Sequence, residues 1–125
     1  MGTDVRTQAA RRAMERMYID TCTISMNAKT VDAKTHVTRQ KWMILAEDEP
    51  CRISFASFPA NGKLDTADVM TQSVKLFLRP EFDVPAGSRI DVKRSGRVVH
   101  YKRSGPVALY PTHQEIEVAL AEEHP

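Results

Sequence analysis

The chain has 125 residues, which is enough for one domain around one hydrophobic core. Its 18 basic and 16 acidic residues give a formal net charge of +2, so the overall charge does not single out DNA or RNA as a partner. No apolar run approaches the roughly 18 residues needed to span a bilayer, and the basic N-terminal segment lacks the apolar stretch of a secretory signal. The composition therefore predicts an intracellular globular domain with no membrane partner.

Residues 1–17 are predicted to form an N-terminal helical arm that starts at a cap on Thr3 or Asp4. Val5, Ala9 and Met17 fall near one face, but this apolar stripe is thin, which favours weak docking or a partner over a place in the core. The remaining surface is basic and is either solvated or a contact surface. The candidate arm contacts are Arg11, Arg12 and Arg16.

From Tyr18 the apolar period changes to two, which is typical of half-buried strands. We expect a first strand with Cys22, Ile24 and Met26 facing inward, and a polar turn over residues 27–36. A second strand is expected at about 37–46, around Trp42, the only tryptophan. Pro50 is expected to open a third strand, with Cys51, Ile53 and Phe55 on one face.

The two cysteines, Cys22 and Cys51, both stand at apolar positions of these strands. Buried reduced thiols pack as small apolar groups, and this is the interpretation that we favour. A disulfide is the alternative, and it would require an oxidising compartment that nothing else in the sequence indicates.

Residues 56–72 have no period, and they contain a proline and an Asn-Gly pair. A connection of this length in a small β domain is uncommon, and such loops are usually functional or disordered. We therefore expect one long irregular loop here, either as a working part or as a plain surface loop.

Regular structure is predicted to resume after this loop, with Val74, Leu76 and Leu78 facing inward. Next comes a hairpin with the two-residue turn Ser95-Gly96. This turn would pair Arg94 with Arg97, Asp91 with His100, Val92 with Val99 and Ile90 with Tyr101, the last two pairs facing the core.

A turn around Gly105-Pro106 is predicted to lead to the last strand, in which Ile116, Val118 and Leu120 face inward and Glu115 and Glu117 outward. Residues 122–125 are expected to be a frayed tail. Together, residues 18–121 predict a mainly β fold, a small partly closed barrel of about six or seven antiparallel strands.

Catalytic, metal-binding and cofactor-binding motifs are not apparent, and we do not expect an enzyme. His36, His100, His113 and His124 lie far apart in the sequence and in no metal-ligand spacing. The Asp91–His100 pair is more typical of a cross-strand charge pair than of acid–base machinery. A strand-centre cysteine such as Cys51 is expected to be inert rather than nucleophilic.

A nucleic-acid-binding barrel is the less favoured alternative, because such barrels need exposed aromatic platforms beside a basic groove. Most aromatic residues here fall in apolar phase, with Phe58 and Phe77 as possible exceptions.

Four segments, in order, resemble a known family: MYIDTCTI, PCRISF, QSVKLFLRPEFDVPAGSRIDVKRSG and YKRSGPVALYPTHQEIEVAL. Their order, above all PAGSRI before the hairpin and YPTHQEI after it, is similar to the head-closure proteins (stoppers, or head–tail connectors) of phages with long non-contractile tails. The likeness covers residues 17–120, and its motifs are structural rather than catalytic. The helical arm before Met17 departs from the pattern.

This resemblance implies a β-barrel that assembles as a homo-oligomeric ring, commonly of twelve copies, in the neck of the virion. The ring would lie below the portal and adaptor, close the DNA channel after packaging and offer a docking surface to tail proteins, with genomic DNA passing close by. It would be made in the cytoplasm of the bacterial host. An adaptor or tail-completion protein is the alternative within the same particle.

The resemblance also implies a role for the long loop, because in such stoppers a loop between strands projects into the channel and can gate it. The matching segment is 56–72, in which the one basic residue, Lys63, stands against Asp65 and Asp68. A loop with so little positive charge is suited to steric closure rather than to gripping phosphate. The side chains available for loop–loop packing are Phe58, Leu64, Val69 and Met70.

The hairpin tip concentrates positive charge, with Lys93, Arg94 and Arg97 beside the turn, whereas Glu115 and Glu117 make the last strand acidic. Opposite charges on different faces suit head-to-tail contacts in a ring. We therefore rank docking to a neighbouring subunit or connector protein first for the tip, DNA contact second and plain solvation third.

Overall fold

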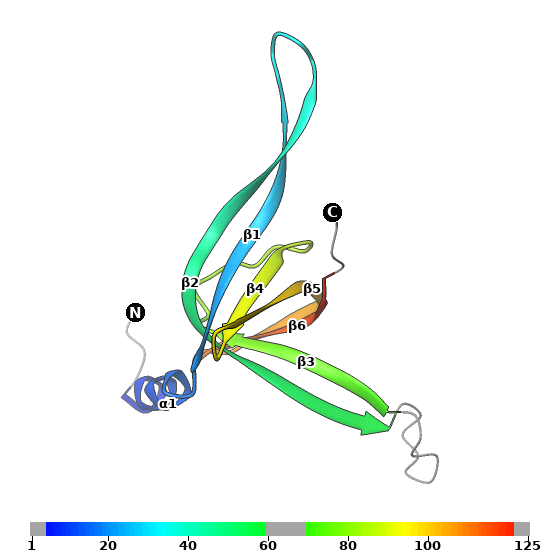
Figure 1. Ribbon diagram of the computed structural model, residues 1–125. Coiled ribbons are helices and arrows are strands. Elements are labelled where there is room, and N and C mark those ends of the chain that lie inside the picture. Colours follow the sequence, from blue (N-terminus) through cyan, green and yellow to red (C-terminus); the bar gives the residue numbers. More distant parts are fainter. Residues whose placement is uncertain (1–4, 60–69, 122–125) are drawn as a thin grey trace.

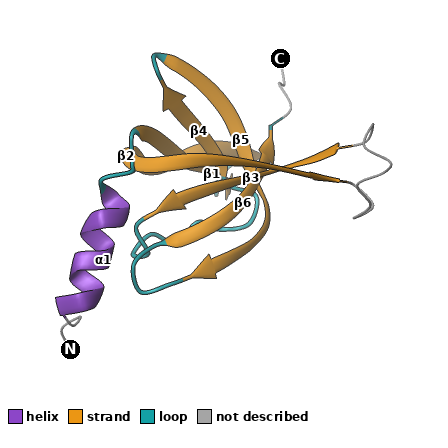
Figure 2. Cartoon of the chain, turned by 90° about the horizontal axis from the view of Figure 1, so that it is seen from below, coloured by secondary structure: helices purple, strands orange, loops and turns teal. Residues whose placement is uncertain are grey.

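The computed structural model describes residues 5–59 and 70–121, and in this part of the chain one helix precedes six strands. All strand pairs are antiparallel, and the strands close into a barrel in the order β1-β2-β3-β6-β5-β4, with β4 pairing back to β1 (Figures 1 and 2). The predicted mainly β fold is confirmed, and the barrel is fully closed. The elements are α1 (Val5–Glu15), β1 (Asp20–Val31), β2 (Thr38–Pro59), β3 (Met70–Leu78), β4 (Arg89–Arg94), β5 (Arg97–Leu109) and β6 (Gln114–Leu120).

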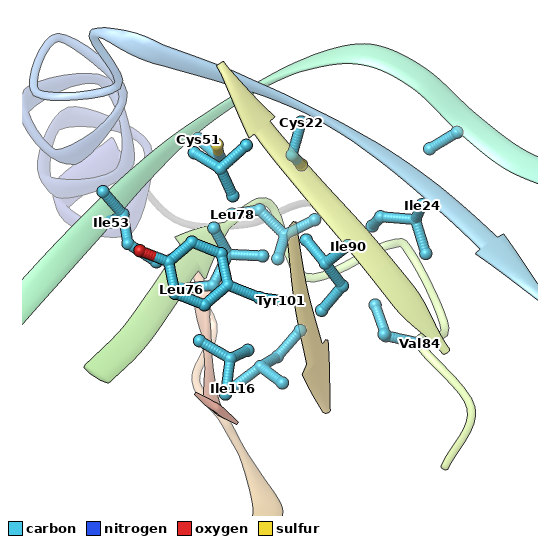
Figure 3. Close-up of a cluster of buried hydrophobic side chains, with 13 residues drawn as sticks. Cys22, Ile24, Cys51, Ile53, Leu76, Leu78, Val84, Ile90, Tyr101 and Ile116 are labelled. Atoms are coloured by element: carbon cyan, nitrogen blue, oxygen red, sulfur yellow. The ribbon is translucent and has the colours of Figure 1, made fainter. Parts of the chain in front are cut away.

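One core fills the barrel, built from alternate side chains of every strand (Figure 3). Leu76, Leu78, Ile90 and Ile116 are completely buried, and each such side chain contributes about 1.5–3 kcal/mol to folding. The segment between β3 and β4 adds Val84, which packs into the same core. The buried apolar residues are Cys22, Ile24, Ala46, Cys51, Ile53, Leu76, Leu78, Val84, Ile90, Val92, Tyr101, Ile116 and Val118.

The β4–β5 hairpin has the predicted register, with Arg94 opposite Arg97, Asp91 opposite His100 and Ile90 opposite Tyr101. Ser95 and Gly96 both have positive φ, 52° and 79°. These angles are those of a type I′ turn, whose twist matches that of the two strands that it joins.

The prediction of separate strands at about 37–46 and from Pro50 is wrong, because both belong to the single strand β2. Two register shifts interrupt its pairing with β1, and Asp48 has a φ of 50°. These bulges break the local alternation without ending the strand. Pairing with β3 begins only at Arg52, so at Pro50 one edge of β2 is still open, a position that tolerates proline.

The predicted turn over residues 27–36 is also wrong in extent, because residues 27–31 continue β1 and pair with residues 38–42. The turn itself occupies residues 32–37. Oδ1 of Asp32 accepts a hydrogen bond from the backbone N–H of Lys34 at 2.8 Å, and His36 has a φ of 57°. The outcome is a long two-stranded ribbon that leaves the barrel (Figure 1).

The irregular connection predicted over residues 56–72 is shorter than expected. Residues 56–59 belong to β2 and pair with residues 70–73, so the β2–β3 hairpin also projects from the barrel (Figure 1). Likewise, the turn predicted around Gly105-Pro106 is a register shift within β5, and β5 reaches β6 only through residues 110–113.

Four residues predicted to face the core are exposed, because each lies at or beyond the end of the barrel wall: Met26, Phe55, Val99 and Leu120. The pairing of β1 with β4 stops at Ser25, and that of β5 with β6 starts at Tyr101, so Met26 and Val99 have no wall opposite. Phe55 lies opposite Val74, where the pairing of β3 with β6 ends, and Leu120 lies opposite Tyr101 in the last pair of β5 with β6.

Candidate functional site

Six of the large apolar side chains that are exposed in the described chain lie on the β1–β2 ribbon. Beyond the Ser25–Arg89 pair this ribbon has no third strand. We call residues 25–44 the arm from here on; this ribbon is a different segment from the N-terminal helix predicted over residues 1–17. A two-stranded ribbon with neither face covered is at best marginally stable in water. Its exposed large apolar side chains are Met26, Val31, Val37, Trp42, Met43 and Ile44.

Both faces of the arm carry apolar groups near its base. Met26 and Met43 lie directly opposite each other on one face, while Trp42 and Ile44 lie on the other, opposite Asn27 and Ser25. Trp42 is 49% exposed and Ile44 61%. Exposed apolar surface of this kind marks an interaction site more often than a solvated one.

The arm is also basic. Residues 25–44 contain four basic residues against Asp32, a net charge of +3. Lys29, Arg39 and Lys41 are exposed and form no ion pair with any described residue. Their charge is therefore available to an acidic partner.

A second apolar surface is concave and lies between the segment that follows β3 and the end of β5. Two adjoining hollows share Pro80, Glu81 and Leu109, and Leu109 is 69% exposed. We call this surface the groove. Its apolar lining is Pro80, Phe82, Val84, Pro106, Val107, Leu109, Tyr110 and Pro111, and the carboxylates at its rim are Glu81 and Asp83.

Two polar side chains that line the groove, Arg103 and Gln114, are already hydrogen-bonded within the chain. Nη1 of Arg103 donates to the carbonyl of Val84 at 2.8 Å, and Nε2 of Gln114 donates to the carbonyls of Arg79 and Phe82 at 2.9 and 2.6 Å. A site for a small polar molecule presents unpaired polar groups that converge on the ligand. The groove presents apolar side chains instead, which suits an apolar peptide segment.

Of the three basic residues at the hairpin tip, the structure engages one within the chain. Nε of Arg94 lies 3.5 Å from Oδ1 of Asp20, a carboxylate that is 2% exposed. Lys93 and Arg97 are exposed and form no ion pair with the described residues. The docking role predicted for the tip therefore rests on Lys93 and Arg97.

Of the two acidic candidates on β6, likewise, only Glu115 has a charged partner among the described residues. Glu115 contacts Lys75 and His113, with Nε2 of His113 2.9 Å from Oε2 of Glu115. Glu117 is exposed and forms no ion pair with the described residues. β5 lies between β6 and the basic tip of β4, so within one chain the structure does not bring these opposite charges together.

The helix α1 has no buried residue. Arg11 forms ion pairs with Glu15 and Glu81, and the hydrogen bond to Glu81 raises the pKa of the Arg11 guanidinium. The contact with Glu81 links α1 to the segment that follows β3, and α1 lies beside the barrel (Figure 2). Arg12 and Arg16 are exposed, and their partner contacts stay a prediction.

Two of the predicted gating residues, Phe58 and Met70, lie on the described part of the β2–β3 hairpin. Phe58 pairs with Thr71 and Met70 with Pro59 in the strand ladder. The gating role stays a prediction. The other candidates, Lys63, Leu64, Asp65, Asp68 and Val69, lie outside the described residues.

The other candidate residues, the Asp91–His100 pair and Phe77, contact side chains of the same chain. Nδ1 of His100 lies 2.5 Å from Oδ1 of Asp91, which Arg89 also contacts. Phe77, a possible platform for bases, is stacked on His113 at 5.4 Å between ring centroids. Within residues 5–59 and 70–121, no three His, Cys, Asp or Glu side chains are grouped so as to hold a metal ion.

Cys22 and Cys51 are buried and reduced, as predicted. A hydrogen bond with the Cys22 thiol, followed by burial, raises the pKa of the Cys51 thiol. Since the thiolate is the nucleophile, Cys51 is held in its unreactive form. In the part of the chain that the structure describes, no helix has the length and apolar character to cross a membrane.

Sequence reasoning missed the arm and the groove. The signal for the arm was present: Trp42, Met43, Ile44 and Leu45 are four consecutive apolar residues, and in a strand such a run places apolar groups on both faces. The groove had no local signal, because it joins residues about 25 positions apart, near 80–84 and 106–111.

No family model matches the sequence, and no curated protein matches it. Among solved structures, the chain is similar to protein xkdH of the phage-like element PBSX from Bacillus subtilis, with a TM-score of 0.51 and 14% sequence identity. The similarity covers 81% of this chain and 93% of that one. At this identity the likeness shows a shared fold.

Proposed function

We propose that this protein is a structural component of a phage or prophage particle. It would form a ring at the head–tail interface that closes the DNA channel after packaging and offers a docking surface to the tail. The observation that carries the proposal is the fold, which this chain shares over most of its length with a protein of a phage-like element. The sequence resemblance to head-closure proteins points to the same place in the particle.

The shape of the surface supports an assembly role. The barrel interior is filled by side chains, whereas two ribbons project from it (Figure 1). Exposed apolar groups on the arm and exposed charges at the hairpin tip offer several separate contacts. A protein that touches like copies on two sides, the portal or adaptor above and tail proteins below needs such separate contacts.

Deletion of the gene in its phage or prophage tests the proposal. We expect electron microscopy of the lysate to show heads without tails beside finished free tails, and a DNA assay to show that these heads have lost their genome. Normal tailed particles that retain DNA would overturn the proposal.

Mass spectrometry of the purified heads then separates head closure from the adaptor and tail-completion alternatives. Neck proteins that join before this one stay on the heads, and those that join after it are missing. Head closure requires that the portal and adaptor remain and that the heads are empty. Heads that lack the adaptor, or that keep their DNA, would point to another neck component.

A further inference from the structure

We propose that the arm of one copy docks in the groove of a second copy of this chain. This inference deepens the proposed function and rests on it, because it names the contact that would join subunits of the ring. The occupant of the groove is the apolar base of the arm, above all Trp42 and its neighbours Met43 and Ile44.

The two surfaces are complementary in chemistry. The groove offers apolar side chains beside the hydrogen-bonded Arg103 and Gln114. Its lining also carries the exposed carboxylate of Asp83 and that of Glu81, which Arg11 of the same chain contacts. The arm offers an aromatic ring and aliphatic groups between unpaired basic side chains, among them Arg39 and Lys41. Apolar anchors surrounded by opposite charges are typical of specific protein interfaces.

The distribution of charge favours another copy of this chain as the partner. The arm has a net charge of +3, and residues 5–17 also have +3. The other described residues carry nine basic and nine acidic side chains, so the barrel itself is neutral. The negative charge that can receive a basic arm is local and lies at the groove, where Asp83 is exposed. Each molecule thus carries both a basic arm and an acidic site beside its groove, which favours head-to-tail association of like chains.

The arm cannot fill the groove of its own chain in the structure described, because the ribbon runs away from the barrel (Figure 1) and Trp42 stays half exposed. The contact is therefore between molecules. Since arm and groove are different surfaces, the association is heterologous, and it closes into a ring when the rotation between copies permits.

The size of the arm indicates that both of its faces must be covered. Seven residue pairs, from Ser25–Ile44 to Val31–Thr38, give a ribbon about 24 Å long. A specific interface buries about 800 Å² per partner, which is more than one face of so narrow a ribbon supplies. An arm inserted in a concave groove meets this demand better than one lying on a flat wall.

Two single variants of the full chain, measured separately and mixed, test the contact. Trp42→Asp removes the arm anchor but keeps the groove, and Leu109→Asp spoils the groove but keeps the arm. We expect the unaltered protein to self-associate in sedimentation velocity with a blue shift of its single tryptophan. Each variant alone should associate roughly tenfold more weakly or worse.

The equimolar mixture should form a heterodimer and stop there, because one intact arm meets one intact groove. The only tryptophan in that mixture is Trp42 on the arm of the Leu109→Asp copy, so its blue shift reports burial of that arm. Leu120→Asp is the matched control, since Leu120 is 67% exposed on β6 and lies outside the groove; it should associate like the unaltered protein. Circular dichroism checks that every variant is folded.

An unaltered protein that stays monomeric up to its solubility limit would overturn the inference, and the arm would then belong to a different partner protein. A mixture that stays monomeric, or a Leu109→Asp variant that assembles normally, would also overturn it. These outcomes are distinct from failure of the proposed function, which shows as normal particles after gene deletion.

Discussion

Arg94 lies against the buried carboxylate of Asp20, with Nε 3.5 Å from Oδ1. The other oxygen of Asp20 accepts a hydrogen bond from the backbone N–H of Ile53 at 3.1 Å, while Oδ1 is buried and has no hydrogen bond. Arg94 is therefore the countercharge for a carboxylate that water does not reach. A residue that the sequence places in a docking patch also ties β4 to the start of β1.

Arg94→Met is expected to lower the free energy of unfolding by about 1–3 kcal/mol, at or below the usual cost of leaving a buried charge unpaired. The lower part of this range reflects the half-exposed Arg94 side chain. Urea unfolding followed by circular dichroism measures the change. Arg97→Met should stay within about 0.5 kcal/mol of the unaltered protein, and adding Asp20→Asn to Arg94→Met should restore part of the loss. Equal effects of the two Arg→Met changes would contradict this role.

The remaining tip charges are expected to act in assembly. Lys93→Glu with Arg97→Glu should reduce incorporation of the protein into particles while leaving its unfolding curve nearly unchanged, because both side chains are exposed and form no ion pair with described residues. Quantitative mass spectrometry of purified particles measures incorporation. Arg6→Glu with Lys102→Glu makes the same change of charge at exposed positions away from the tip and is the control. Normal incorporation of the tip variant would remove docking from its role.

The predictions that succeeded are those in which local sequence decides the structure. Ser95-Gly96 sets the register of β4 and β5, since the turn geometry belongs to the two residues themselves. The alternation around Leu76 and Ile116 likewise gives their burial correctly, because both lie where the barrel is closed on each side. The mainly β fold follows from such segments.

The predictions that failed depend on pairing between distant segments. The sequence predicts two strands where the structure has the single strand β2, because Asp48 and Pro50 interrupt the local alternation. In the structure β1 pairs with both parts of β2, and bulges absorb the interruption. The exposure of Met26 and Phe55 follows from where the pairing with β4 and β6 ends rather than from their own neighbours in sequence. The arm extends beyond the last pair of β1 with β4, and the groove joins segments about 25 positions apart in the sequence, so periodicity alone reveals neither.

Tyr18 is expected to make the protein sensitive to alkali. Its hydroxyl is buried without a hydrogen-bond partner, and burial, with a smaller effect of the Glu15 carboxylate, raises the pKa of Tyr18 to about 12. In the unfolded chain the phenol loses its proton near pH 10. Between these values the unfolded state is the one that releases the proton, so stability should fall as the pH rises from about 10 to 12 and should be unaffected below that range.

Urea unfolding at several pH values from 8 to about 11.5, with Tyr18→Phe as the comparison, measures this effect. The variant should lose less stability over the alkaline range, and at pH 8 it should be at least as stable, because it removes an unpaired buried hydroxyl. Parallel pH profiles for the two proteins would show that Tyr18 titrates like an exposed tyrosine.

Gln114 is expected to be the main polar anchor of the groove. It is 2% exposed, and its amide nitrogen donates to the carbonyls of Arg79 and Phe82 at 2.9 and 2.6 Å. These bonds fix the segment that forms one side of the groove to the first residue of β6. Gln114→Met has a similar volume but leaves both carbonyls without this donor, at a cost of about 2–4 kcal/mol.

Urea unfolding of Gln114→Met measures the stability loss, and hydrogen exchange at residues 79–84 shows whether this segment loosens. Gln72→Met is the control, since Gln72 is exposed on β3 and should change stability by less than about 0.5 kcal/mol. If the groove receives the arm of another copy, Gln114→Met should also weaken self-association at temperatures where the barrel is still folded. A variant as stable as the control would show that these carbonyls find other donors and that the groove does not depend on Gln114.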